Sequence, residues 1–171
     1  MHYIKSKISR YFIFRHYWWI GIILGASAVA TAFRFGGEDR LGLIGAAIAG
    51  TLGFFYFVQQ QKLSETTLFL NLFTAFNARY DKLNGPLSEI VEQDKPASTE
   101  QRNLIVDYFN LCAEEYLFYR EGYIHHHVWR SWCRGMLWYL RRHPFKNVWH
   151  EEVKSDSFYG LSLDVIEKGA L

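Results

Sequence analysis

The chain has 171 residues and a formal net charge of +2, and half of its residues are hydrophobic. Residues 1–58 hold six Lys or Arg and two acidic residues, whereas residues 59–171 hold thirteen Lys or Arg and fifteen acidic residues. A globally basic nucleic-acid-binding protein would not show this division. The two cysteines, Cys112 and Cys133, lack the spacing of a metal site or a disulfide framework, so we expect buried, reduced thiols.

Two stretches without charged residues, 16–33 and 41–61, are long enough to cross a bilayer. A spanning helix needs about 20 residues, with a lower limit of about 17. Both segments must be helical because hydrocarbon offers the backbone no hydrogen-bond partner. The connection 34–40 is short and polar. We therefore predict an antiparallel transmembrane hairpin with spans at about 17–33 and 41–58.

Aromatic residues flank both predicted spans at the end away from the connecting loop. Residues 17–19 read Tyr-Trp-Trp and begin the first span, while residues 54–57 read Phe-Phe-Tyr-Phe and end the second. A hairpin brings these two ends together, so we expect one aromatic belt at one membrane interface.

The orientation of the hairpin follows from its basic residues. Four of them precede the first span: Lys5, Lys7, Arg10 and Arg15. The loop holds two, Arg34 and Arg40. The positive-inside rule then predicts cytoplasmic N- and C-termini and an external loop. The alternative is a cleaved signal peptide, because Ala28-Val29-Ala30 resembles a cleavage site after an apolar core.

Both spans contain small residues at helical spacing. The glycines concerned are Gly21 and Gly25 in the first span, and Gly42, Gly45, Gly50 and Gly53 in the second. Small residues let transmembrane helices approach closely. In one interpretation these glycines only pack the hairpin against itself. In the other, the second span has two small-residue faces and one remains free for another subunit. Neither span contains a charge, which argues against an ion pathway within one subunit.

We predict an all-α membrane protein in three parts. These are a basic cytoplasmic N-terminus at 1–16, the transmembrane helical hairpin at 17–58 and a small cytoplasmic helical domain at 59–171. Apolar residues keep their helical spacing beyond the second span, so this span is predicted to continue into a stalk helix. The sequence Asn-Gly-Pro at residues 84–86 is expected to end the stalk.

Further helices are predicted after the stalk. Ser98 and Gln101 form a capping box that begins a helix ending at Arg120. The later predicted helices lie at 125–143, where Pro144 stops the helix, around Trp149 and around 163–168.

Glu115 falls within the apolar arc of the predicted helix at 99–120. A buried carboxylate is costly unless it is paired or protonated. Arg79, at the rim of the stalk's apolar face, is the expected partner, with Arg134 as a second candidate. We predict a buried Arg79–Glu115 ion pair that fixes helix packing. No partner carboxylate or nucleophile stands at useful spacing, so no catalytic residue is predicted.

Three consecutive histidines at 125–127 resemble a metal-binding tract. Adjacent residues on a helix point in different directions, so they cannot share one ion. We expect a solvated helix start here, and we predict no metal or cofactor site.

The stretch 123–150 contains no acidic residue. Within it Arg130, Arg134 and Arg141 align on one face of the predicted helix. Such a basic face suits anionic lipid headgroups, a nucleic-acid or protein partner, or the domain's own acidic helix. The sequence leaves these alternatives open.

Three sequence blocks together resemble a known group of proteins. They read Phe-Asn-Ala-Arg-Tyr-Asp-Lys-Leu at 76–83, Tyr-Phe-Asn-Leu at 108–111 with Glu-Glu at 114–115, and Tyr-Arg-Glu-Gly-Tyr-Ile at 119–124 before a Trp-rich helix. The combination resembles a family of small bacterial membrane-anchored helical proteins. It is similar to the two-helix membrane effectors encoded beside phage-defence reverse transcriptases (retrons). The likeness covers about residues 60–145 and transfers no catalytic residue.

The resemblance implies a non-enzymatic effector of anti-phage defence in the bacterial inner membrane. Its partners would be the lipid bilayer, further copies of itself and a reverse transcriptase with its RNA–DNA product, with no small-molecule substrate. Release from the partner complex would let the effector oligomerise and permeabilise or depolarise the membrane. The alternative function is a membrane-tethered adaptor whose helical domain binds a protein or nucleic acid.

Overall fold

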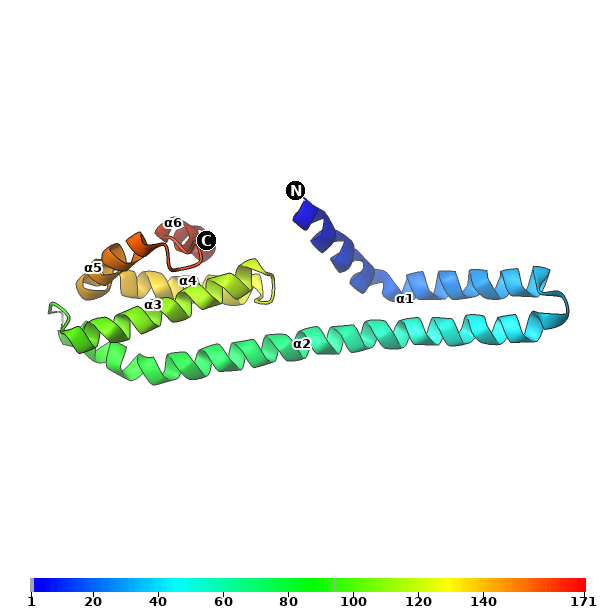
Figure 1. Cartoon of the computed structure of the whole chain (residues 1–171), viewed down its shortest axis with the longest axis horizontal. Coiled ribbons are helices and arrows are strands. Elements are labelled where there is room, and N and C mark those ends of the chain that lie inside the picture. Colours follow the sequence, from blue (N-terminus) through cyan, green and yellow to red (C-terminus); the bar gives the residue numbers. More distant parts are fainter. Residues whose placement is uncertain (1, 94) are drawn as a thin grey trace. The chain divides into compact units, whose positions relative to one another are not determined.

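The computed structural model describes residues 2–93 and 95–171, and side chains from residue 16 onward within them. The described residues form helices joined by turns, and none of them lies in a β-strand (Figure 1). The elements are α1 (His2–Phe35), η1 (Gly37–Asp39), α2 (Arg40–Gln93), α3 (Thr99–Arg120), α4 (His126–Leu140), α5 (His143–Glu152), η2 (Val153–Ser155) and α6 (Leu163–Ala170). The prediction of an all-helical chain is confirmed. The chain divides into two compact units, Met1–Thr66 and Thr67–Leu171, and α2 contributes to both.

The first unit contains the apolar helix α1 and the apolar first part of α2, which the sequence predicted. By length and composition, the helices His16–Phe35 and Gly37–Gln93 are able to cross a membrane. Large apolar side chains on them point outward, and those of Trp19 and Leu52 are 68% and 64% exposed. An extended apolar surface of this kind marks a membrane or protein interface.

Within this unit α1 packs antiparallel against the beginning of α2. The ring centroid of Phe55 lies 4.8 Å from that of Trp18 and 6.2 Å from that of Tyr17. The Lys62 ammonium lies 4.1 Å from the centroid of the Tyr17 ring. The two aromatic clusters therefore meet at the end of the hairpin away from the loop, as the sequence predicted.

The predicted end of the stalk at residues 84–86 is wrong, because α2 continues to Gln93 with Pro86 inside it. A proline inside a helix costs about 3 kcal/mol, since it removes a backbone donor and crowds the preceding turn. Figure 1 shows α2 changing direction in its last turns. Leu87 and Ile90 are buried there, with exposed fractions of 0% and 2%. Burying two such side chains contributes roughly 1.5–3 kcal/mol each, which offsets the cost of the proline.

The second unit has one apolar core, to which the end of α2 and all four following α-helices contribute. Its largest fully buried side chains include Ile105, Phe109, Trp129, Met136, Phe145 and Ile166. Helix α3 meets α5 where the Phe109 ring centroid lies 4.9 Å from that of Trp149. Helix α6 packs closely on α4 at Gly169, where an added Cβ would lie 2.6 Å from both Cys133 Sγ and Trp129 Nε1.

The start of α3 confirms the predicted capping box. The Gln101 backbone N–H donates to Ser98 Oγ at 3.3 Å, and the Ser98 backbone N–H donates to Gln101 Oε1 at 3.0 Å. Helix α3 ends at Arg120, as predicted, and Gly122 follows it with a φ of 85°.

The single helix predicted at 125–143 ends three residues early, at Leu140. Pro144 does not merely stop a helix: it lies in the first turn of α5. Proline is well suited to that turn, because the first helical N–H groups have no partner within the helix. The short helices expected around Trp149 and around 163–168 are confirmed as α5 and α6.

Candidate functional site

The two glycines of α1 pack directly against α2. A Cβ added at Gly21 would lie 2.5 Å from Cζ of Phe55, and one added at Gly25 would lie 2.6 Å from Oγ1 of Thr51. Real Cβ atoms do not approach other atoms this closely. The GxxxG motif of α1 therefore closes the hairpin, as the first interpretation of these glycines requires.

Four glycines in the apolar first part of α2 have open space beside their backbone in the described part of the chain. A Cβ added at Gly42, Gly45, Gly50 or Gly53 would meet no atom within 4 Å. Helix α2 packs on α1 through Thr51 and Phe55 instead. At 100° per residue, all four glycines fall on the half of the helix opposite these two residues. The two faces expected from the sequence thus form one broad small-residue face, which we call the glycine face.

The predicted ion pair between Arg79 and Glu115 is wrong. Arg79 pairs instead with Glu114, the residue before Glu115. Its Nη2 donates to Oε1 of Glu114 at 3.1 Å, and Nη1 makes a second, shorter contact with Oε2. Both side chains are partly exposed, at 46% and 36%. The guanidinium stays hydrated at this rim, whereas reaching Glu115 would require burying a charge.

The prediction that Glu115 is buried is correct, because the residue is 6% exposed. Burial raises the pKa of its carboxyl from 4.5 to about 8; attraction to Arg79 opposes this shift and repulsion from Glu114 adds to it. Glu115 is therefore mostly protonated at neutral pH. A neutral carboxyl costs far less to bury than an ion pair, so the core needs no buried cation beside it.

The two cysteines are free and buried, as predicted. Burial raises the pKa of the Cys112 thiol well above its ordinary value and that of Cys133 to about 12. Both thiols stay protonated at neutral pH, and a protonated thiol is a weak nucleophile and a weak metal ligand. Among the residues that the structure describes, no three His, Cys, Asp or Glu side chains lie together as a metal site would require.

The three histidines at the start of α4 make aromatic contacts. All three are exposed, and His125 occupies the N-cap position of α4 without a side-chain capping bond. The His125 ring centroid lies 4.4 Å from that of Phe69, and the His126 ring lies 6.4 Å from that of Tyr119. They form the solvated helix start expected from the sequence.

The basic face of α4 has no acidic partner among the described residues. The Nε of Arg130 is buried without a hydrogen-bond partner there. Arg134 donates its Nε to the carbonyl oxygen of Ala170, at 3.2 Å, and Arg141 is exposed. The ion pairs among the described residues involve Arg79, Arg102, Arg120 and Lys168. The sequence analysis allowed the basic face to pair with the domain's own acidic helix, and no such pair occurs among these residues.

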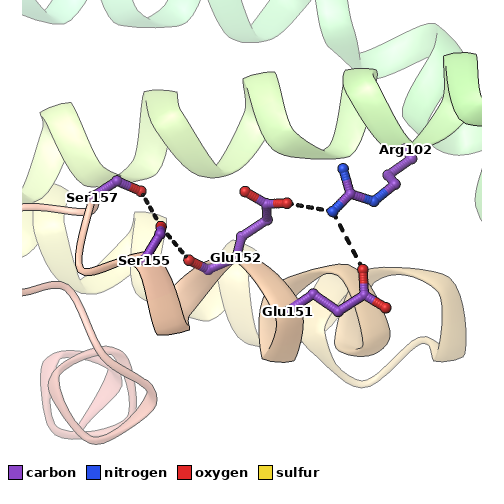
Figure 2. A network of polar contacts seen from close by, with 5 residues as sticks. All are labelled: Arg102, Glu151, Glu152, Ser155 and Ser157. Atoms are coloured by element: carbon purple, nitrogen blue, oxygen red, sulfur yellow. Dashed lines mark hydrogen bonds and ion pairs between the residues drawn. The ribbon is translucent and has the colours of Figure 1, made fainter.

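Figure 2 shows a polar network that holds the turn after α5 against α3. Arg102 Nη2 on α3 donates to Glu151 Oε2 at 3.3 Å and also contacts Glu152 Oε1. Ser155 Oγ donates to the Glu152 backbone oxygen at 2.6 Å and lies 2.8 Å from Ser157 Oγ. The network fixes the turn that leads into residues 156–160.

That turn borders a groove of about 460 Å³ that the sequence did not indicate. Its lining combines side chains of α2, α3 and the turn: Arg79, Lys82, Leu83, Asp107, Asn110, Glu114, Ser157 and Tyr159. Tyr159 has a φ of 53°, and its carbonyl accepts a hydrogen bond from Arg120 Nη1 at 3.1 Å. No short sequence motif foretells this groove, because three separate segments form it.

No protein-family model matches this chain, and no curated protein or solved structure is significantly similar to it.

Proposed function

We propose that this protein is a non-enzymatic membrane effector whose α1 and α2 cross the bacterial inner membrane as a hairpin and assemble with further copies. The glycine face of α2 carries this proposal. A Cβ added at any of the four glycines of this face would meet no atom within 4 Å. The two glycines of α1, in contrast, pack against α2 inside the hairpin. Leucine-like surfaces gain nothing by leaving lipid, whereas a small-residue face allows another helix to approach closely.

The proposed topology places both termini in the cytoplasm and the loop outside. It is supported by the four basic residues before the first span against two in the loop. It is also consistent with the free cysteines of the second unit, since the cytoplasm keeps thiols reduced. The second unit, with the stalk part of α2, is then the cytoplasmic helical domain.

In the proposed mechanism a partner complex holds the effector silent, and release lets copies associate and depolarise the membrane. The sequence blocks at 76–83, 108–115 and 119–124 support a role in phage defence, with a reverse transcriptase and its RNA–DNA product as the partner. Assembly through uncharged glycines does not itself create a selective pore. We therefore propose a general loss of the membrane barrier rather than transport of one ion.

Expression of the chain without its partners in bacterial cells tests the proposal. We expect the protein to remain in the membrane fraction after alkaline carbonate extraction and to depolarise the cells, as followed by a potential-sensitive dye. Full membrane insertion with normal potential and normal growth would reject the effector function.

A membrane-tethered adaptor is the second candidate, and the unpaired basic face of α4 favours it. Arg130 and Arg141 form no ion pair with the described residues, and the exposed Arg141 is accessible to phosphate or carboxylate groups of a partner. An adaptor would leave the membrane potential intact. Replacing Arg130 and Arg141 by glutamine should abolish partner binding by an adaptor and leave its membrane insertion unchanged.

A further inference from the structure

An apolar groove of about 970 Å³ runs along one side of the α1–α2 hairpin. Its walls are built by residues of both helices, among them Ile22, Ala26, Val29, Phe33, Ile48 and Leu52. The one hydroxyl in the lining, that of Thr51, already donates to the backbone oxygen of Ala47 at 2.8 Å. The groove therefore offers hydrocarbon contact and no free hydrogen-bonding group along its length. Its volume lies within the roughly 300–1,000 Å³ typical of ligand sites.

Two arginines close this groove at the end beside the loop. Arg34 lies in the last turn of α1, and Arg40 is the first residue of α2; both line the groove. The Arg40 guanidinium lies 5.0 Å from the centroid of the Phe33 ring. Neither arginine forms an ion pair with a carboxylate of the described residues. Glu38 and Asp39 lie in the same loop but do not line the groove, so the charged groups of its lining are the two arginines.

The other side of the hairpin provides an internal comparison. A smaller groove of about 400 Å³ is lined there by Ala28, Thr31, Ala32, Phe35, Gly36, Leu43 and Ala47. No charged residue belongs to its lining. The two grooves share apolar walls and differ in charge, so only the larger one combines a hydrocarbon trough with an anion-binding end.

We propose that the larger groove binds an anionic phospholipid, with an acyl chain along the trough and the phosphate between Arg34 and Arg40. This inference rests on the proposed membrane insertion. Guanidinium groups bind phosphate oxygens in a bidentate manner, and basic pockets between transmembrane helices hold anionic headgroups. A second copy of the chain fits this groove less well. Copies that met through this groove in the same orientation would bring their Arg34 and Arg40 charges together, whereas the glycine face lies on the other side of α2.

The test uses the full chain, purified in a neutral detergent and given equimolar phosphatidylglycerol and phosphatidylcholine. Native mass spectrometry then counts the lipids that stay bound. Exposed charge pairs contribute about 0.2–1 kcal/mol each, so two arginines correspond to a roughly two- to thirtyfold preference for phosphatidylglycerol. The double variant Arg34→Gln/Arg40→Gln should lose this preference. Lys62→Gln, which removes a positive charge from the opposite end of the hairpin, should keep it.

A second pair of variants tests the trough without changing charge. Ala30 lines the larger groove and Ala28 the smaller one, and both are exposed residues of α1. Ala30→Phe fills the trough and should release the bound lipid, whereas Ala28→Phe should retain it. Equal retention of both lipids by the unmodified chain would overturn the proposal. Loss of the preference in Lys62→Gln as well would also overturn it, since any surface charge would then be sufficient.

The remaining outcomes separate this inference from the proposed function. If Ala30→Cys forms a disulfide with a second copy and no lipid is retained, another protomer occupies the groove and the lipid proposal fails. If the chain is removed from membranes by alkaline carbonate, the proposed membrane function fails first. A chain that stays inserted and depolarises cells, but binds both lipids equally, contradicts the lipid site alone.

Discussion

Arg79 on α2 and Glu114 on α3 form a two-contact ion pair at the edge of the second unit, with Nη2 and Oε1 3.1 Å apart. Glu115, the next residue, points into the core and is 6% exposed. One carboxylate therefore works as a surface ion-pair partner and its neighbour as a buried, mostly neutral group. This division of roles leads to two contrasting predictions.

Glu114→Gln should destabilise the protein only slightly. Both members of the ion pair are partly exposed, and such pairs contribute about 0.2–1 kcal/mol because water screens them. We expect the melting temperature of the detergent-solubilised full chain to fall by a few degrees at most. A loss of several kcal/mol in the free energy of unfolding would mean that the pair is far less hydrated than its exposure indicates.

Glu115 should make the protein less stable as the pH rises. Its pKa is about 8 in the folded state and near 4.5 in the unfolded chain. At a pH between these two pKa values, the Glu115 carboxyl is protonated in the folded state and ionised in the unfolded state. The free energy of unfolding then falls by roughly 1.4 kcal/mol per pH unit from this group, from about pH 5 to about pH 8.

Glu115→Gln should remove this decline, because the amide stays neutral at every pH. The variant is expected to equal the unmodified protein near pH 5 and to exceed it in stability near pH 8. Thermal unfolding in a neutral detergent, followed by near-ultraviolet circular dichroism, measures the difference. Glu114→Gln is the matched control and should keep the original slope. Parallel pH profiles for Glu115→Gln and the unmodified chain would show that Glu115 is ionised in the folded state.

A pair of glycines tests how α6 docks on α4. An added Cβ at Gly169 would lie 2.6 Å from Cys133 Sγ and Trp129 Nε1, whereas one at Gly135 would meet nothing within 4 Å. We expect Gly169→Ala to destabilise the protein by about 1–3 kcal/mol through overpacking. Gly135→Ala should stabilise it by roughly 0.5–1 kcal/mol, because alanine loses less backbone entropy in a helix. Thermal melts with the same sign for both variants would refute the close packing at Gly169.

Features set by local sequence were predictable, and features set by packing were not. The capping box of Ser98 and Gln101 depends on residues three apart, and the structure has it as predicted. The end of α2 depends on Leu87 and Ile90 reaching a core built by distant helices. A proline in the sequence does not indicate how much apolar surface is buried by the residues after it. The helix end predicted at residues 84–86 was therefore wrong.

The site residues follow the same division. Burial of Glu115 was visible in the apolar arc around it, but the choice of Glu114 as the partner of Arg79 was not. Adjacent helical residues differ by 100° in direction, and only the packed position of the neighbouring helix decides which of them an arginine reaches. The three grooves were missed for a related reason, because their walls combine side chains from separate helices.

The glycine face of α2 yields the prediction that tests assembly most directly. Gly45→Leu with Gly53→Leu should leave membrane insertion and hairpin packing intact. A Cβ added at either site meets no atom within 4 Å, and leucine favours insertion of a helix into lipid. The bulky side chains would keep a second helix from approaching. We expect normal abundance in the membrane fraction, together with loss of chemical crosslinks between copies and of depolarisation on expression.

Two further variants make this result specific. Gly45→Ala with Gly53→Ala keeps the face small and should retain both crosslinking and depolarisation. Gly21→Leu with Gly25→Leu places bulk against Phe55 and Thr51 inside the hairpin, so it should lower the amount of folded protein instead. Full depolarisation by the Gly45→Leu/Gly53→Leu variant would show that copies do not meet through α2. Assembly would then have to use another surface of the hairpin, and the contact-free glycines would have only a lipid-facing role.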